Sequence, residues 1–144
     1  ADQPFYGVYC GQSALPLEPE PLRYLTNDTL RGCTVYDYET GSELPVYDLQ
    51  QLVGEDAYAV FLSGSKALLP ITNPAAKTDR ELVVFRDSFA SSLTPLLAGA
   101  YAKITLVDIR YLQPERLGTW LTFDTQDVLF LYSAPVLNSS ETIR

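Results

Sequence analysis

The chain has 144 residues, 47% of them apolar, and its 18 acidic and 10 basic side chains give a net charge of −8. This length and apolar content are typical of one domain with a hydrophobic core, and no apolar run approaches the ~20 residues that span a bilayer. Because an acidic surface repels phosphate backbones, the charge argues against nucleic-acid binding.

Two cysteines, Cys10 and Cys33, occur in a chain that has no histidine and no methionine. Their separation matches no zinc-binding spacing and the sequence has no histidine, so we do not expect a structural zinc site. The function predicted below implies no metal and no organic cofactor. The two side chains are compatible with one disulfide in an exported protein and also with two buried thiols. The sequence leaves both possibilities open.

The first part of the chain predicts extended structure. Residues 1–24 are rich in proline, most densely over 15–21, which is typical of an extended segment on the surface. Apolar and polar residues alternate over 34–38 and 44–47 around Gly41, which predicts an antiparallel β-hairpin. Pro45 should place its strand at an edge.

The following segments predict a short helical turn over 48–52 and a buried strand over 57–62 that ends at Ser63-Gly64-Ser65. Residues 82–85 are wholly apolar, as expected for a strand covered on both faces. Residues 90–102 predict a helix with Pro95 in its first turn. The residues that we expect on its apolar face are Leu93, Leu96, Leu97 and Tyr101.

The rest of the chain predicts a strand over 104–107, partly helical structure over 116–121 and a last strand over 127–132. Strands alternating with helices indicate a parallel sheet, so the expected fold class is α/β with an antiparallel hairpin attached at its start. We expect a single domain over 1–144. Residues 1–56 would form the extended segment and hairpin, and 57–144 the α/β portion.

Ligands of parallel sheets bind at the carboxyl ends of the strands. Three polar groups are predicted there: Arg86-Asp87-Ser88, Asp108-Ile109-Arg110-Tyr111, and Ser133. If the strands over 82–85 and 104–107 are neighbours, Ser88 and the Asp108–Arg110 pair lie close together. Ser88 is then a candidate nucleophile, with backbone N–H groups beside it that can stabilise an oxyanion.

Each of these residues also has an ordinary structural interpretation. Ser88 and Asp87 are both of types that cap helices or close turns. Asp108 and Arg110 can form an ion pair at the strand end, and Tyr111 can serve in packing. The residues alone therefore do not distinguish a site from local structure.

Residues 81–97 (ELVVFRDSFASSLTPLL) closely resemble the nucleophile region of DHHW-family proteins, in which a hydrophobic strand runs into Asp-Ser-Tyr/Phe and a Pro-Leu-Leu-like helix. Residues 101–111 (YAKITLVDIRY) match the family's next strand and its Asp-x-Arg-Tyr signature. Further similarities cover 5–7, 56–64 and 127–133, so the resemblance extends over nearly the whole chain.

The DHHW family is similar to SGNH hydrolases and to bacterial alginate O-acetyltransferases. The resemblance implies an incomplete SGNH/flavodoxin-like three-layer fold with Ser88 as the catalytic nucleophile. Asp87 belongs to the same motif, and Asp108, Arg110 and Tyr111 correspond to the family pattern as possible site-lining residues. The resemblance also implies that the partner Asp and His come from an Asp-His motif nearer the N-terminus.

This chain departs from the family pattern because it contains no histidine. A serine hydroxyl is a poor nucleophile without an adjacent base, whose help contributes ~10²–10⁴-fold. We therefore expect the chain to be inactive alone. Two explanations are open: the C-terminal portion of a longer protein whose upstream part carries the base, or a natural pseudo-enzyme.

The predicted function is that of an SGNH-type esterase or O-acyltransferase for cell-envelope carbohydrate, of which this chain is the C-terminal portion. Its expected partners are acylated carbohydrate or an acyl donor and the upstream part of the same protein. The resemblance implies a location outside the cytoplasm. The alternative is a non-catalytic envelope module that binds glycan or a protein partner and retains the fold without the chemistry.

Overall fold

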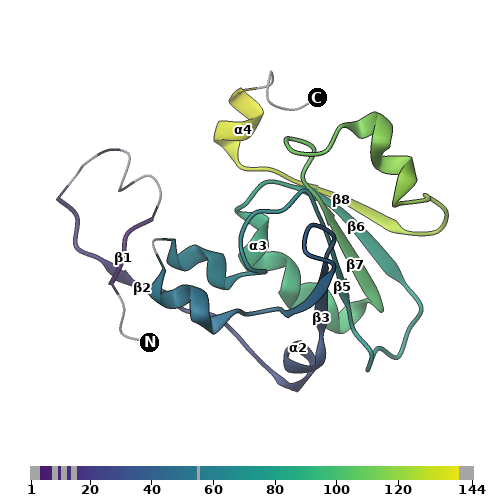
Figure 1. The fold of residues 1–144 in the computed structure, drawn as a ribbon, viewed down its shortest axis with the longest axis horizontal. Helices are drawn as coiled ribbons and strands as arrows, with labels where there is room; N and C mark the ends of the chain where they lie inside the picture. Colours follow the sequence, from purple (N-terminus) through teal and green to yellow (C-terminus); the bar gives the residue numbers. More distant parts are fainter. Residues whose placement is uncertain (1–3, 8–9, 11–12, 14–15, 55, 140–144) are drawn as a thin grey trace.

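The computed structural model describes residues 4–7, 10, 13, 16–54 and 56–139. Six strands form its central sheet: β3 (Thr34–Asp37), β4 (Ser42–Pro45), β5 (Leu68–Thr72), β6 (Glu81–Arg86), β7 (Lys103–Val107) and β8 (Asp127–Leu131). Their order is β4-β3-β5-β7-β6-β8 (Figure 1). The helices are short: α2 (Asp28–Gly32), α3 (Ala90–Leu93), α4 (Ala134–Asn138), and the 3-10 helices η1 (Leu49–Val53), η2 (Ala57–Val60), η3 (Thr94–Ala100) and η4 (Pro114–Thr119).

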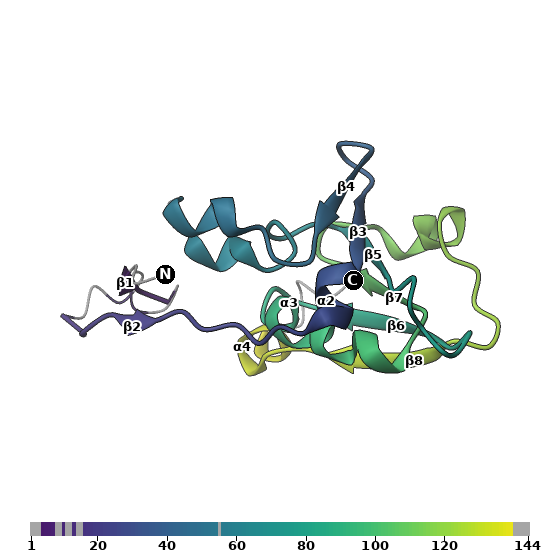
Figure 2. The same cartoon turned by 90° about the horizontal axis from the view of Figure 1, so that it is seen from below.

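The proline-rich start of the chain forms an arm that extends away from the sheet (Figure 2). Within it, β1 (Pro4–Phe5) pairs antiparallel with β2 (Glu20–Pro21). Residues 16–18 and 20–21 are exposed. The predicted extended surface segment is therefore confirmed over 16–24, where each proline lacks the N–H for further pairing, whereas Cys10 and Ser13 are helical.

The predicted hairpin is confirmed as β3 and β4, whose register pairs Thr34 with Pro45. Gly41 in the connecting turn has φ of +68°, a conformation that glycine adopts without steric cost. Pro45 lies in the edge strand of the sheet, as predicted. Because β3 also pairs with β5, the hairpin is part of the central sheet.

The hairpin predicts a specific contribution to acid stability. Asp37 is 2% exposed. Burial acts to raise its pKa, but hydrogen bonds from Glu39 N–H and the Thr40 side chain, together with the charge of Lys66, outweigh burial and hold the pKa below its usual value. A folded-state pKa below the unfolded value of ~3.9 gives stability that is present above about pH 4 and lost as the pH falls through the folded pKa.

The unfolding free energy of the unmutated chain should fall between about pH 5 and pH 2, and we expect this fall to be smaller in Asp37→Asn. Urea titration at each pH measures it. The matched substitution Asp124→Asn, at an exposed position, should leave that loss unchanged. Identical pH profiles for Asp37→Asn and the unmutated chain would contradict the assignment.

The second half of the sheet is parallel, because β6 pairs in parallel with both β7 and β8. Leu82, Val83 and Val84 of β6 are at most 4% exposed, as its wholly apolar sequence predicts. The expected parallel sheet is nevertheless only partly observed. β5 runs antiparallel to β7, so the sheet as a whole is mixed.

The predicted strand over 57–62 is wrong. Residues 57–60 form η2, because the carboxylate of Asp56 accepts a hydrogen bond from Tyr58 N–H at 3.0 Å and starts a helical turn. Leu62 and Ser63 then have positive φ values of 59° and 55°, which turn the chain away from an extended path. Only an isolated bridge between Tyr47 and Phe61 remains.

The strand β5 has no counterpart among the predicted elements, because Pro70 in its middle argues against a central strand. The structure accommodates Pro70 opposite Thr105 of β7, while the ladder to β3 reaches only Ile71 and Thr72. Proline's missing N–H therefore leaves no gap in the β3 ladder.

The predicted helix over 90–102 is also corrected. The α-helix ends at Leu93, and η3 continues with Pro95 near its start, since Pro95 has no N–H to continue the α-helical pattern. Leu93 and Leu96 are exposed rather than buried. Leu97 and Tyr101 do pack against the core.

Buried side chains form two clusters on the sheet. The larger joins α2, η3 and the strands, and the smaller joins Leu117 and Leu121 around η4 to Val83 and Val107.

Cys33 is buried, and no disulfide joins it to Cys10 among the described residues. None of the described helices has the length and apolar content needed to cross a membrane.

Candidate active site

The Asp87-Ser88 turn lies where the strand order of the sheet reverses. From β6 the chain goes to β7 on one side of β6, and later returns to β8 on the other side. The carboxyl end of β6 is therefore a topological switch point, the place where parallel sheets bind ligands. This order brings the ends of all three parallel strands around one turn.

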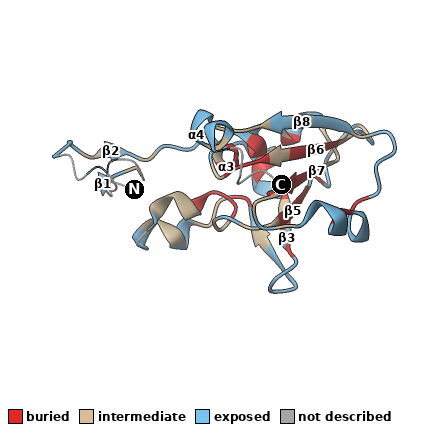
Figure 3. Cartoon of the chain, turned by 90° about the horizontal axis from the view of Figure 1, so that it is seen from above, coloured by how far each residue is buried: buried red, intermediate tan, exposed pale blue. Residues whose placement is uncertain are grey.

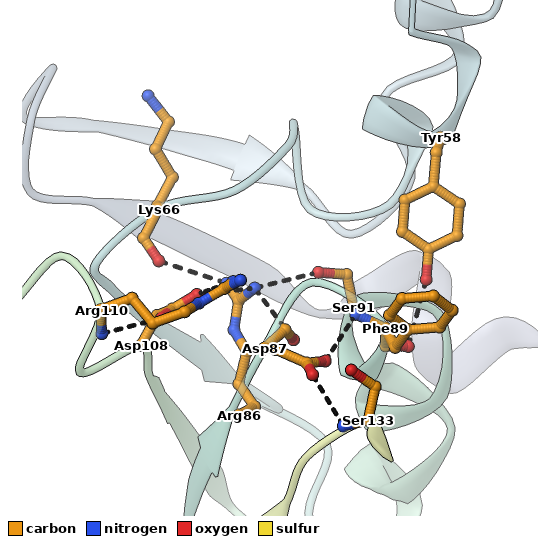
Figure 4. Close-up of polar contacts among 9 residues, drawn as sticks. All are labelled: Tyr58, Lys66, Arg86, Asp87, Phe89, Ser91, Asp108, Arg110 and Ser133. Carbon is orange, nitrogen blue, oxygen red and sulfur yellow. Dashed lines mark hydrogen bonds and ion pairs between the residues drawn. The ribbon is translucent and has the colours of Figure 1, made fainter. Parts of the chain in front are cut away.

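Asp87 holds this turn in place. Its carboxylate is 1% exposed and accepts hydrogen bonds from Phe89 N–H at 3.0 Å and from Ser133 N–H at 2.7 Å (Figure 4). The first bond closes the turn around Ser88, and the second connects the end of β6 to the residues that follow β8. Both carboxylate oxygens of Asp87 are therefore engaged in structure.

Ser88 is half-buried at the centre of the turn. It does not cap α3, whose N-cap residue is Phe89 and has no side-chain cap bond. The backbone carbonyl of Ser88 accepts from Ser91 N–H at 3.1 Å. The Ser88 hydroxyl and N–H make no hydrogen bond to any residue that the structure describes. Both groups are thus available to a ligand.

Asp108 and Arg110 form a closed ion pair at the end of β7. Asp108 is fully buried and accepts from Arg110 Nη2 at 2.6 Å, Nε at 2.9 Å and the backbone N–H at 3.1 Å. The hydrogen bonds to Asp108 raise the pKa of Arg110. Both carboxylate oxygens of Asp108 therefore accept from Arg110 and hold it in place.

Arg86 connects this pair to the Ser88 turn. Its guanidinium is fully buried, with Nη1 at 3.9 Å from the Asp108 carboxylate and at 3.3 Å from Ser91 Oγ (Figure 4). Burial lowers the pKa of Arg86, and the neighbouring Asp108 and Asp87 carboxylates oppose that effect. The Nε atom of Arg86 has no hydrogen-bond partner within the described part of the chain.

The structure thus links Asp87, Asp108 and Arg110 into one polar cluster through Arg86, and Ser88 follows Asp87 in the turn beside it. Tyr111 lies outside it. Its side chain is 62% exposed, and its ring centroid is 5.4 Å from the guanidinium carbon of Arg110. Tyr111 is therefore not a packing residue of the core, and none of its described contacts reaches Ser88.

Tyr58 is a member of this region that the sequence does not reveal. It belongs to η2, and its hydroxyl donates to the Phe89 carbonyl at 3.1 Å and contacts Ser92 Oγ at 3.1 Å. Tyr58 thereby holds the start of α3 from above the turn (Figure 4). No pattern around residue 58 indicates this contact, because it joins segments 31 residues apart.

We expect Tyr58→Phe to lower the free energy of unfolding by about 1 kcal/mol, since it removes a hydrogen bond while keeping the ring. Urea unfolding followed by circular dichroism measures the change. Tyr38→Phe is the matched control: Tyr38 is exposed, and no hydrogen bond of its hydroxyl is found in the described structure. An equal effect of the two substitutions would show that the Tyr58 hydroxyl does not stabilise the turn.

None of the described nitrogen bases faces Ser88. Lys66 Nζ pairs with Glu39 at 2.7 Å and with Asp37 at 3.6 Å, and its side chain points away from Asp87 (Figure 4). Lys103 lies opposite Glu81 in the ladder, at the other end of β6, and Lys77 lies in the loop that precedes that end. With no histidine in the sequence, the described part of the chain offers Ser88 no general base. It also contains no cluster of three or more residues arranged as metal ligands.

A cavity of about 250 Å³ opens on the β8 side of the turn. It is bordered by Asp87, Phe89, Ala90, Leu93, Leu131, Tyr132 and Ser133. The Tyr132 hydroxyl is buried and has no hydrogen-bond partner among the described residues. Burial, followed by the charges of Asp108 and Asp87, raises the pKa of Tyr132. The hydroxyl is therefore a neutral donor.

No protein-family model and no curated protein matches the sequence. Solved structures do match the fold. A DHHW family protein from Eubacterium siraeum matches with a TM-score of 0.62 and 20% identity, over 87% of this chain and 43% of that protein. PatB1 from Bacillus cereus with a sulfonyl adduct matches with a TM-score of 0.61 and 21% identity, over 85% and 44%. A second structure of Bacillus cereus PatB1 matches with a TM-score of 0.51 and 23% identity, over 73% and 36%.

The resemblance to DHHW proteins is thus supported by a solved member of that family with the same fold. At these identities the similarity shows a shared fold. The chain spans less than half the length of the solved structures that it matches.

Proposed function

We propose that this chain is the serine-bearing portion of an SGNH-type esterase or O-acyltransferase that acts on cell-envelope carbohydrate outside the cytoplasm. Ser88 is its nucleophile. The observation that carries the proposal is the Ser88 turn itself: it lies at the switch point of the sheet, is locked by Asp87, and leaves the Ser88 hydroxyl and N–H available.

The chemistry follows from these two groups. Ser88 Oγ attacks the carbonyl carbon of an acyl ester, while a base from outside these 144 residues accepts the hydroxyl proton. The Ser88 N–H donates to the oxyanion, an interaction that contributes about 3 kcal/mol in acyl-transfer enzymes. The bond to the leaving alcohol breaks, and the alcohol receives the proton. Water or an acceptor sugar hydroxyl then attacks the acyl-Ser88 ester and releases the acyl group.

The PatB1 match adds chemical support. That protein was solved with a sulfonyl adduct, and sulfonylating reagents attach to activated nucleophilic side chains. A fold that holds such an adduct in one protein is compatible with a reactive serine in this one.

Covalent labelling tests the proposal. The longest product of the encoding gene should react with a serine-directed fluorophosphonate at Ser88, identified by peptide mass spectrometry. Ser88→Ala should lose the label, whereas Ser65→Ala, at an exposed serine outside the turn, should retain it. Labelling that survives in Ser88→Ala would assign the reactive group to another residue.

A non-catalytic glycan- or protein-binding module is the second candidate, favoured by the absence of a base among the described residues. The observation that favours this candidate is a groove of about 230 Å³, which is bordered by Tyr38, Glu39, Leu112 and Trp120. Exposed aromatic rings beside a carboxylate suit sugar binding. An unlabelled Ser88 in the longest gene product, with glycan binding that Trp120→Ala reduces at least about tenfold, would favour the module.

A further inference from the structure

β8 is an edge strand with no partner on its outer side. It pairs with β6 on one side, and within the described chain no other strand of the sheet borders it. An unpaired edge exposes a row of backbone N–H and C=O groups, and proteins usually protect such an edge with charges, proline or a covering segment. The five residues of β8 are DVLFL, which contain one charge and no proline.

One face of β8 is also uncovered. Val128 is 46% and Phe130 is 68% exposed, although strands in the parallel part of a sheet are normally covered on both faces. Phe130 and Phe123 both stack on Phe85, with ring centroids at 4.9 and 6.3 Å. Val83 on the neighbouring β6 is 1% exposed because residues around η4 cover it. Figure 3 shows this contrast between exposed β8 and buried β6.

The uncovered edge continues to the Ser88 turn. The apolar cavity beside Asp87 borders Leu131, Tyr132 and Ser133, which end or follow β8. On the opposite side of β6 the space is taken by β7 and the closed Asp108–Arg110 pair. The cavity on the β8 side is bordered by Asp87 and Phe89, the two residues that flank Ser88 in the chain.

From these observations we infer that β8 is the junction for the rest of a longer protein, which adds a strand along its edge and covers Val128 and Phe130. The solved structures of this fold are more than twice as long as the part matched here, which leaves a polypeptide of suitable size. A second copy of this chain is the poorer occupant, because it also lacks histidine. Resting on the proposed function, the same segment carries the base to Ser88 from the β8 side.

Thiol labelling in the longest product of the encoding gene tests this junction. Phe130→Cys and Leu25→Cys place a thiol at two positions with matched exposure, 68% and 72%, in the chain described here. For each variant, the rate of maleimide labelling of the folded protein is divided by the rate for the same variant unfolded in urea. The unmutated protein gives the background labelling of Cys10 and Cys33. We expect the thiol of Phe130→Cys to react at least about tenfold more slowly than that of Leu25→Cys. Val128→Cys repeats the measurement in case Phe130→Cys does not fold.

Equal normalised rates for these two variants would overturn the inference, as would a gene product no longer than this chain. Protection that disappears when the protein is diluted to a monomer would assign the surface to a second copy instead. A Ser88 that resists the fluorophosphonate would reject the proposed function, while the cysteine comparison would still decide the junction. Where Ser88 does react, Phe130→Lys should slow its labelling at least about tenfold, and Leu25→Lys should not.

Discussion

Replacement of Ser88 by alanine in the longest gene product is expected to lower its hydrolysis of acetyl esters by at least about 10³-fold, since alanine cannot form the acyl-enzyme intermediate. Release of acetate or a chromogenic alcohol measures the rate. The fold should remain intact, because the Ser88 side chain makes no hydrogen bond in the described structure. The far-ultraviolet circular dichroism and the urea midpoint should therefore match those of the unmutated protein.

Ser92→Ala provides the matched control in the same turn region. Its hydroxyl contacts Tyr58 but does not occupy the switch point, so activity should fall by less than about fivefold, the loss expected for one hydrogen bond of ~1 kcal/mol. Unchanged turnover in Ser88→Ala would reject Ser88 as the nucleophile. If Ser88→Ala lost activity and its circular dichroism and urea midpoint also fell, the loss would reflect unfolding, and the turn would be rejected as a preformed site.

Asp108→Ala should have the largest effect on stability, a decrease of about 3–5 kcal/mol in the free energy of unfolding. Asp108 is fully buried, binds Arg110 through three hydrogen bonds and is the ion-pair partner of the fully buried Arg86. Its removal leaves a buried cation without that carboxylate, which costs more than the pair itself contributes. Urea unfolding at neutral pH measures the change, and Asp108→Asn should give a smaller loss because the amide oxygen can still accept a hydrogen bond.

The exposed pair of Asp28 and Arg31 provides the comparison. Its charges are 2.9 Å apart, but the two side chains are 100% and 61% exposed. Solvent screens such a pair, so Asp28→Ala should have a much smaller effect on the urea midpoint than Asp108→Ala. A similar shift for the two substitutions would mean that burial does not govern the strength of the Asp108 cluster.

Most of the sheet could be predicted from the sequence because its strands are short apolar or alternating runs between turn residues. β6, β7 and β8 and the hairpin of β3 and β4 follow this rule. The rule fails for β5, where Pro70 hides a central strand, and for η2, where the apolar run over 57–62 begins with an aspartate cap. In both cases one residue's backbone chemistry outweighs the hydrophobic pattern.

The candidate site was predictable to the extent that it depends on neighbouring parallel strands. Ser88 follows one strand and Asp108 follows the next along the chain, so their proximity follows once β6 and β7 pair. The contribution of Ser133 depends on β8 lying on the other side of β6, and that of Tyr58 on η2 crossing over α3. Contacts between segments 31 to 46 residues apart leave no local pattern in the sequence.

Residue identity and order were enough to predict that Ser88 follows an apolar strand and to show that the sequence holds no histidine to activate it. The roles of Asp87, which closes the turn, and of Asp108, which binds Arg110, become visible only in the folded chain. The hydrogen bond from Ser133 to Asp87, for example, depends on β8 lying beside β6. The same strand order leaves β8 at an edge of the sheet, because within the described chain β8 pairs only with β6.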